Sequence, residues 1–322
     1  MSGGEAGAGR SSGGAAGATT GGVGGSGGGG NSGAGAAPLP PELTWTREGQ
    51  TNGYNGIWGT GADDVYAVGQ AGMILHSKGD GSWVAQPSGT SASLTGVWGS
   101  GAGDIYISVN SNVVLHSTGD GTWEHEVLDA GHTLKDIWGT SSTDLYAVAE
   151  NGLLRGDGTG KWTPQAASGN APASAIWGSS ASDLYVVAQT LTGSNIFHST
   201  GDGTWRSQAS TGAAMNDIWG AGPNRVFAAG GAFVFSSDGK GAWAPELTAT
   251  GDSVRAVWAA SANAVYACTV NGMFYRSNGA GIWSEPQPIN GTGPARSCYA
   301  IWGSGPYNLY LGTSNGIYHG VP

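Results

Sequence analysis

Four short stretches between residues 94 and 128 decide the fold: Leu94–Ser100 (LTGVWGS), Asp104–Val109 (DIYISV), Val113–Ser117 (VVLHS) and Trp123–Leu128 (WEHEVL). Each stretch has five to seven residues and is rich in β-branched and aromatic side chains. Gly, Ser, Asn and Asp lie between them, and this pattern is typical of strands joined by tight turns. The segment therefore predicts four consecutive short β-strands.

The same unit recurs along the chain. A Trp-Gly dipeptide begins at Trp58, Trp98, Trp138, Trp177, Trp219 and Trp302, and Trp-Ala at Trp258 fills the remaining place, with spacings of 40, 40, 39, 42, 39 and 44 residues. A second Trp follows each of the first six by 24 to 28 residues, at Trp83, Trp123, Trp162, Trp205, Trp243 and Trp283. Four strands in a period of about 40 residues match one blade of a β-propeller. Seven units predict an all-β, seven-bladed propeller with four antiparallel strands per blade.

The two ends of the chain fit a ring that closes on itself. The last unit stops after its third strand, at Gly316–Gly320 (GIYHG), whereas Leu43–Glu48 (LTWTRE) resembles a fourth strand and contains the remaining tryptophan, Trp45. We expect this N-terminal strand to complete the last blade and so to remove the open sheet edges that invite aggregation. The propeller is accordingly assigned to residues 43–322.

Residues 1–42 have a different composition. The first 40 contain 17 of the 62 glycines, no aromatic residue and two charges, Glu5 and Arg10, and a Pro-rich stretch follows at 38–41. Such a segment buries too little apolar surface to offset its ordering entropy. We expect a disordered, Gly/Ser/Ala-rich tether.

Charge and hydropathy exclude several functions. The 12 basic and 22 acidic residues give a net charge of −10, and the basic residues are scattered singly, which argues against nucleic acid as a partner. No apolar run approaches the roughly 20 residues of a membrane-spanning helix, and the N-terminal residues lack the pattern of a signal peptide. We expect no transmembrane segment.

Two resemblances add to this interpretation. The segments Ser117–Trp123 and Ser199–Trp205 (both STGDGTW) resemble the Asp-box turns of sialidase-like and photosystem-assembly-factor-like propellers. The Gly-rich tether followed by Trp-Gly repeats is similar to secreted or lipid-anchored propeller proteins of myxobacteria-like bacteria. The second resemblance implies an exported bacterial protein at the cell surface or outside the cell, with Met1 standing where a native precursor would carry a lipidated Cys.

Most repeated positions are expected to be structural. An active site breaks symmetry, so all fourteen tryptophans are assigned to packing between blades, with stacking of outer-strand indoles on sugar rings as the alternative. The turn after each first strand carries Asp64, Asp104, Asp144, Asp183, Asn224, Asn263 and Asn308, which we expect to cap the turns through backbone hydrogen bonds. The third strands carry His76, His116, Arg155, His198, Ser236, Arg276 and His319, which we expect to hydrogen-bond or to stack on Trp. These histidines belong to different blades, so we predict neither a metal site nor a cofactor.

Function is expected where the repeats differ. The residues just before each first-strand Ile/Val-Trp pair are variable and mostly polar: Asn55, Thr95, Lys135, Ser174, Asn216, Arg255 and Tyr299, with Asp136 and Asp217 beside them. Innermost strands border the axis of a propeller, and a long loop at 188–195 and a long connection at 288–296 are expected on the same face. A concave polar face of this kind is the default ligand site. The candidate ligand-binding residues are Asn55, Lys135, Asn216, Arg255, Tyr299, Gln189 and Asn195.

The two cysteines lie close to this face. Cys268 ends the second strand of blade six, and Cys298 begins the first strand of blade seven. They are either bridged or free, and a disulfide would suit an exported protein.

Three functions remain open. The first is a non-enzymatic, lectin-like binding module for cell-surface or extracellular carbohydrate, because aromatic faces and few charges suit sugars. The second is a monomeric protein-binding or assembly scaffold of the bacterial envelope. The third is a glycoside hydrolase or polysaccharide lyase with one site at the central channel, which would use Asp136, Asp217, Lys135, Arg255 and Tyr299.

Overall fold

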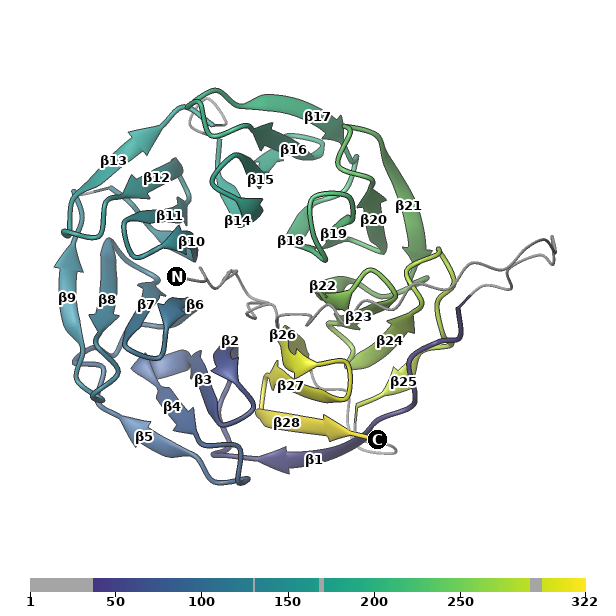
Figure 1. The fold of residues 1–322 in the computed structure, drawn as a ribbon, viewed down its shortest axis with the longest axis horizontal. Coiled ribbons are helices and arrows are strands. Elements are labelled where there is room, and N and C mark those ends of the chain that lie inside the picture. Colours follow the sequence, from purple (N-terminus) through teal and green to yellow (C-terminus); the bar gives the residue numbers. More distant parts are fainter. Residues whose placement is uncertain (1–36, 130, 168–170, 290–296) are drawn as a thin grey trace, which may run out of the picture.

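The computed structural model describes residues 37–129, 131–167, 171–289 and 297–322. Within these residues the chain forms seven four-stranded antiparallel sheets, arranged radially around a common axis (Figure 1). This confirms the predicted seven-bladed β-propeller. The only helical element of the described residues is a single 3-10 turn, η1 (Gln70–Gly72).

The first four blades follow the chain in order, each from its innermost to its outermost strand. Blade one contains β2 (Tyr54–Gly61), β3 (Asp64–Gly69), β4 (Ile74–Ser77) and β5 (Val84–Gln86). Blade two contains β6 (Leu94–Gly101), β7 (Asp104–Val109), β8 (Val113–Ser117) and β9 (Glu124–Val127). Blade three contains β10 (Leu134–Ser141), β11 (Asp144–Ala149), β12 (Gly152–Gly156) and β13 (Trp162–Gln165). Blade four contains β14 (Ala173–Ser180), β15 (Asp183–Thr190), β16 (Gly193–Ser199) and β17 (Arg206–Ser210).

The last three blades continue the ring. Blade five contains β18 (Met215–Gly220), β19 (Val226–Gly230), β20 (Phe233–Ser237) and β21 (Trp243–Thr248). Blade six contains β22 (Val254–Ser261), β23 (Ala264–Thr269), β24 (Met273–Ser277) and a short β25 (Gln287–Pro288). Blade seven contains β26 (Cys298–Gly305), β27 (Asn308–Thr313), β28 (Gly316–Val321) and, as its outermost strand, β1 (Thr44–Glu48).

The ring closes through its N-terminal strand, as the sequence predicts. Strand β1 pairs antiparallel with β28, from Thr44 opposite Val321 to Glu48 opposite Ile317 (Figure 1). Glu48 then joins two blades, because its carboxylate accepts hydrogen bonds from His319 Nδ1 at 2.9 Å in blade seven and from the Trp83 indole at 3.0 Å in blade one. The ring therefore closes through a backbone ladder that completes blade seven, a carboxylate shared with blade one, and the packing of Trp302 against Gly59.

The first tryptophan of each blade packs against the next blade. These seven indoles are between 0 and 4% exposed. The Trp58 ring lies so close to Gly99 that a methyl group added there would be 2.5 Å from Cη2, and Trp177 lies in the same way against Gly220. The missing side chain of the Trp-Gly pair therefore leaves room for the neighbouring indole.

The second tryptophan of each repeat, together with Trp45, is half-buried. Several of these indoles donate to the outer strand of the preceding blade: Trp123 to Gln86 at 3.0 Å, Trp162 to Glu126 at 3.0 Å and Trp243 to Gln208 at 3.1 Å. The indole N–H is thus part of the contact between blades.

The prediction that the Asp and Asn side chains of the turns bond to the backbone is wrong, because they bond to a side chain of the third strand. The Asp64 carboxylate accepts from His76 Nε2 at 2.8 Å rather than from the backbone, and the imidazole stacks on Tyr66 at 4.3 Å rather than on a tryptophan. Blades two, three, four and seven repeat the arrangement with Asp104 and His116, Asp144 and Arg155, Asp183 and His198, and Asn308 and His319. The two columns pair with each other, so they tie the second strand of a blade to its third.

In blades five and six the residue equivalent to Asp64 is not the predicted asparagine but the residue after it. Asp64 lies six residues after Trp58, and the same interval in blades five and six leads to Arg225 and Ala264, not to Asn224 and Asn263. Arg225 pairs instead with Glu246 on the outer strand of its blade. Blades five and six therefore depart from the pattern of the other five.

Candidate functional site

A β-bulge lies at the start of every innermost strand, and in six blades a second shift in pairing lies near the other end of that strand. In each blade the pairing between the first two strands slips by one residue, for example between Leu134 and Asp136 in blade three and between Val254 and Ala256 in blade six. The extra residues are Asn55, Thr95, Lys135, Ser174, Asn216, Arg255 and Tyr299, one per blade. Bulges re-aim a side chain and are frequent beside binding sites. We call these seven residues the bulge ring.

Several residues at the bulge-ring end of the propeller hold neighbouring blades together. The Asn55 amide donates to Leu94 O at 2.9 Å, and the Asn216 amide donates to Val254 O at 3.0 Å. Thr95 and Gln189 make equivalent bonds to Leu134 O at 3.3 Å and to Met215 O at 3.0 Å. In each case the acceptor is the carbonyl just before the bulge residue of the next blade, so the bulge ring is held in place from blade to blade.

Two cations stand in the bulge ring. Lys135 Nζ lies 2.8 Å from the carboxylate of Glu150, on the adjacent hairpin. The Arg255 guanidinium lies 5.6 Å from the centre of the Tyr299 ring and donates to Asn216 Oδ1 at 3.4 Å. Asn216, Arg255 and Tyr299 therefore form one contact chain across blades five, six and seven.

The two acidic residues predicted as a catalytic pair are completely buried. Asp217 accepts from its neighbour Ile218 N at 2.9 Å and from Val257 N, in the next blade, also at 2.9 Å. Asp136 bridges Ile137 N and Ile176 N in the same way, at 2.9 and 3.3 Å. Both side chains are 0% exposed. Each carboxylate is therefore a staple between adjacent blades and does not line a surface.

A hairpin of blade four projects at the same end of the ring. Strands β15 and β16 stay paired out to Thr190 opposite Gly193, so the segment expected to be a long loop is an extension of the sheet. Asn195 lies within β16, opposite Ala188. At the tip, Leu191 is fully exposed, with a relative accessibility of 106%. Sequence reasoning missed this leucine, although a large apolar residue between two threonines in a turn was a usable signal.

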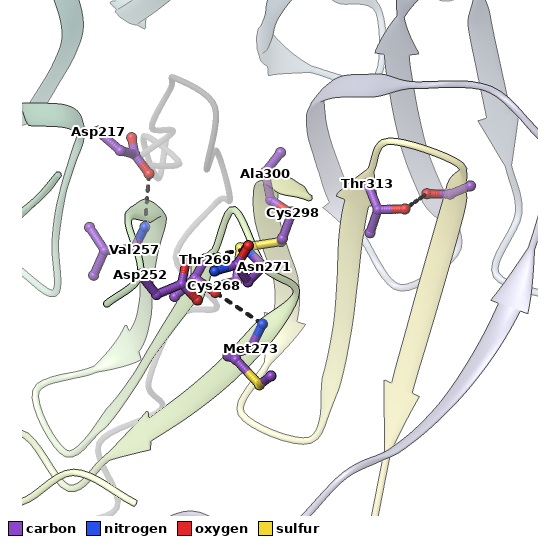
Figure 2. The surroundings of a disulfide bond; sticks show 11 residues. Asp217, Asp252, Val257, Cys268, Thr269, Asn271, Met273, Cys298, Ala300 and Thr313 are labelled. Atoms are coloured by element: carbon purple, nitrogen blue, oxygen red, sulfur yellow. Dashed lines mark hydrogen bonds between the residues drawn. A yellow bond between two sulfur atoms is a disulfide. The ribbon is translucent and has the colours of Figure 1, made fainter. Parts of the chain in front are cut away.

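A disulfide fixes the boundary between blades six and seven, also at this end. Figure 2 shows Cys268, at the end of β23, bonded to Cys298, at the start of β26, with their Cα atoms 5.9 Å apart. Both sulfurs are in fully buried residues. Because Cys298 directly precedes Tyr299, the bond anchors that member of the bulge ring. Of the nearby 288–296 connection, residues 290–296 lie outside the described part of the chain.

The pKa values of two groups in the packing between strands and blades follow from burial and hydrogen bonding. Burial, with a contribution from the Asp64 charge, raises the pKa of the Tyr66 phenol to about 12. Although burial raises the pKa of Glu48, hydrogen bonds from His319 and Trp83 outweigh it and hold that pKa below the ordinary value. These groups belong to the repeated packing and to ring closure. The described residues contain no group of three or more His, Cys, Asp or Glu side chains that could hold a metal ion.

Comparison with known proteins places the chain by its architecture. No family model and no curated protein matches the sequence. Among solved structures, YCF48 bound to D1 peptide has a TM-score of 0.69 and 15% identity, with coverage of 88% of this chain and 99% of that chain. Virginiamycin B lyase from Staphylococcus aureus has a TM-score of 0.76 and 17% identity, covering 87% and 99%. The extracellular domain of the one component system BT4673 from B. thetaiotaomicron has a TM-score of 0.68 and 14% identity, covering 86% and 40%.

At these identities the likeness defines the fold alone. The chain is a seven-bladed β-propeller, and its structural neighbours include a peptide-bound protein, a lyase and the extracellular part of a sensor. No helix in the described residues is long and apolar enough to cross a membrane. Function has to be argued from the site itself.

Proposed function

We propose that the protein is a non-enzymatic binding propeller that holds a segment of a partner protein at the end of the ring defined by the bulge ring. The observation that carries the proposal is the meeting of three features at that end. They are the bulges in all seven blades, the contact chain from Asn216 to Tyr299, and the projecting hairpin with Leu191 at its tip.

The chemistry of this end suits a polypeptide. The amide and cationic side chains of Asn55, Asn216, Lys135 and Arg255 are partly exposed at this end and would face a main chain, and the exposed Leu191 would add one apolar contact. Because Asn55 and Asn216 are already bonded to neighbouring blades, the surface is preorganised. Preorganisation lowers the entropic cost of binding.

The same geometry favours this proposal over the two alternatives. A lectin needs open aromatic faces, whereas Tyr307, which lies at the opposite end of β26, is the one aromatic side chain among the large exposed apolar residues of the described chain. A glycosidase needs two accessible carboxylates, whereas Asp136 and Asp217 are staples between blades. YCF48 has been solved with the D1 peptide, which gives a precedent for a peptide ligand on this architecture.

We further propose that the protein acts outside the cytoplasm, at the cell surface or in the envelope of a bacterium. A buried disulfide between two blades requires oxidising conditions to form and is typical of exported proteins. Of the predicted tether 1–42, the part that precedes Ala37 would then link the propeller to an anchoring point, because Ala37, Pro40 and Glu42 are held by blade six. We expect the propeller to act as a monomer.

The proposal is tested by capture from an envelope extract with immobilised full-length protein, followed by an array of peptides from each captured partner. A double variant, Lys135→Ala with Arg255→Ala, and a single variant, Leu191→Asp, alter the proposed surface. The matched control is Tyr307→Ala, because Tyr307 is 56% exposed and lies in the turn at the opposite end of β26. We expect the first two variants to lose binding to a captured partner and to its peptide, and we expect the control to keep both.

Two results would overturn the proposal. One is a partner that binds all three variants as tightly as it binds the native protein. The other is binding to an array of neutral or acidic glycans, abolished by the ring variants, with no peptide captured. That second result would restore the carbohydrate-binding alternative.

A further inference from the structure

Blade six departs from the repeat at its outer rim. In blades one to four and seven, an Asp or Asn at the start of the second strand pairs with the His or Arg of the third strand. In blade six the equivalent residue is Ala264, so Arg276 of the third strand has no acidic partner at that position. The outermost strand, β25, is only two residues long. Figure 1 shows the N-terminal segment running past β25 on its way to β1.

That segment is held by blade six through directional contacts. The Arg276 side chain is 7% exposed. It donates from Nη1 to Pro40 O at 2.6 Å, and its Nη2 lies 3.3 Å from Oε1 of Glu42. Asn278 donates to Ala37 O at 2.6 Å, and Gln287 donates to the Glu42 carboxylate, also at 2.6 Å. Pro40 itself is buried. A nearly buried guanidinium that binds both a main-chain carbonyl and a carboxylate is a built recognition site.

We propose that this rim is a binding site for an extended, proline-containing segment that carries an acidic residue. Residues Ala37–Glu42 of the same chain occupy it, and the site accepts the same segment of a second copy of this chain when its own is released. Arg276, Asn278 and Gln287 are its recognising residues. We call these three residues the rim site.

The recognition follows from the conformation of the ligand. Proline favours an extended backbone without internal hydrogen bonds, so its carbonyls are available to an outside donor. The rim site reads the carbonyls of Ala37 and Pro40 and the side chain of Glu42. The bonds to Ala37 and Pro40 reach main-chain carbonyls, so the pair of the Glu42 carboxylate and the Arg276 guanidinium selects the acidic side chain.

The covalent link explains why the chain holds its own segment. Strand β1 begins at Thr44, directly after the segment, so the segment stays near the rim site at a high effective concentration. A second copy competes only when the internal contact is weakened. Exchange of an identical element between copies is a common route to dimers, and internal occupation of the rim site would keep the native protein monomeric.

Two full-length chains with complementary defects test this directly. The variant Glu42→Lys places a cation opposite Arg276, which weakens its own segment but leaves the rim site intact; Glu42 is 74% exposed, so the fold is not at risk. The variant Arg276→Ala lacks the rim contact but has a native segment. We expect each variant to sediment alone as a monomer and an equimolar mixture to form a 1:1 dimer whose population rises with concentration.

The controls separate this proposal from loss of folding and from the proposed function. If Arg276→Ala fails to fold by circular dichroism, the double variant Asn278→Ala with Gln287→Ala takes its place. A mixture that stays monomeric at the highest concentration would overturn the proposal, as would a dimer that also forms when the Glu42→Lys chain carries Arg276→Ala. Capture of an envelope partner at the bulge ring does not depend on this result, since the rim site lies on a different part of the molecule.

Discussion

Substitution of Gly99 by alanine probes the contact between an indole and a glycine of the next blade, which six of the seven blades repeat and in which Ala259 replaces the glycine of blade six. The added methyl would lie 2.5 Å from Cη2 of Trp58 and 2.7 Å from the carbonyl oxygen of Asp104, and neither can move away cheaply because one is a buried indole and the other is backbone. Overpacking of this kind costs about 1–3 kcal/mol. The loss of glycine's freedom in the unfolded chain returns about 0.4–1 kcal/mol. We expect a net loss of roughly 1.5 kcal/mol in the free energy of unfolding.

The matched control lies in the same strand. A methyl at Gly101 meets no atom within 4 Å, so Gly101→Ala should be neutral or slightly stabilising. Urea titration followed by tryptophan fluorescence would measure both variants, and the thermal midpoint of Gly99→Ala should fall by about 3–6 °C. If the two variants are equally stable, the indole of one blade does not rest on the glycine of the next, and the account of the Trp-Gly repeat fails.

Three further perturbations act on the contacts between blades. Asp217→Asn removes one of two acceptor oxygens and leaves a buried backbone N–H unpaired, so urea titration should show a loss of about 2 kcal/mol; stability equal to the native protein would contradict the staple. Replacing Cys268 and Cys298 by serine opens a loop of 30 residues, and we expect thermal unfolding to show a loss of up to about 3.6 kcal/mol, against no change if the bond is dispensable. Hydrogen bonds from His319 and Trp83 lower the pKa of Glu48, so the ionised carboxylate stabilises the fold above the ordinary carboxyl pKa and this stabilisation is lost as the pH falls through the lowered value. Urea titration at a series of pH values should show that the free energy of unfolding falls less steeply with acid in Glu48→Gln than in the native protein, and identical slopes would refute this.

The fold followed from periodicity because periodicity is a direct consequence of how a blade is built. Each blade has to place one large side chain against its neighbour, so Trp58 and its six equivalents recur at the repeat length. The unpaired third strand at the C-terminus and the extra Trp45 predicted the pairing of β1 with β28. These features depend on local pattern, which a single sequence displays.

The site was predicted less well, because position in the ring does not reveal the partner of a side chain. Asp136 and Asp217 lie beside the bulge ring, as expected, but a polar residue at an innermost strand can turn towards the next blade and be buried. Polar identity points to Asn224 and Asn263 in the turns of blades five and six, whereas the constant six-residue interval from tryptophan leads to Arg225 and Ala264. The third-strand residue does not reveal this shift, because Arg155 replaces the histidine in blade three and still pairs with Asp144.

The central claim is that the bulge-ring end of the propeller binds a protein segment, and hydrogen exchange on the full-length protein tests it most directly. The exchange of backbone amides would be compared with and without a peptide captured from the envelope extract. We predict protection at the starts of the innermost strands, around Lys135, Arg255 and Tyr299, and in the hairpin that carries Leu191. Protection confined to the outer strands, or to the opposite turns around Tyr307, would contradict the account.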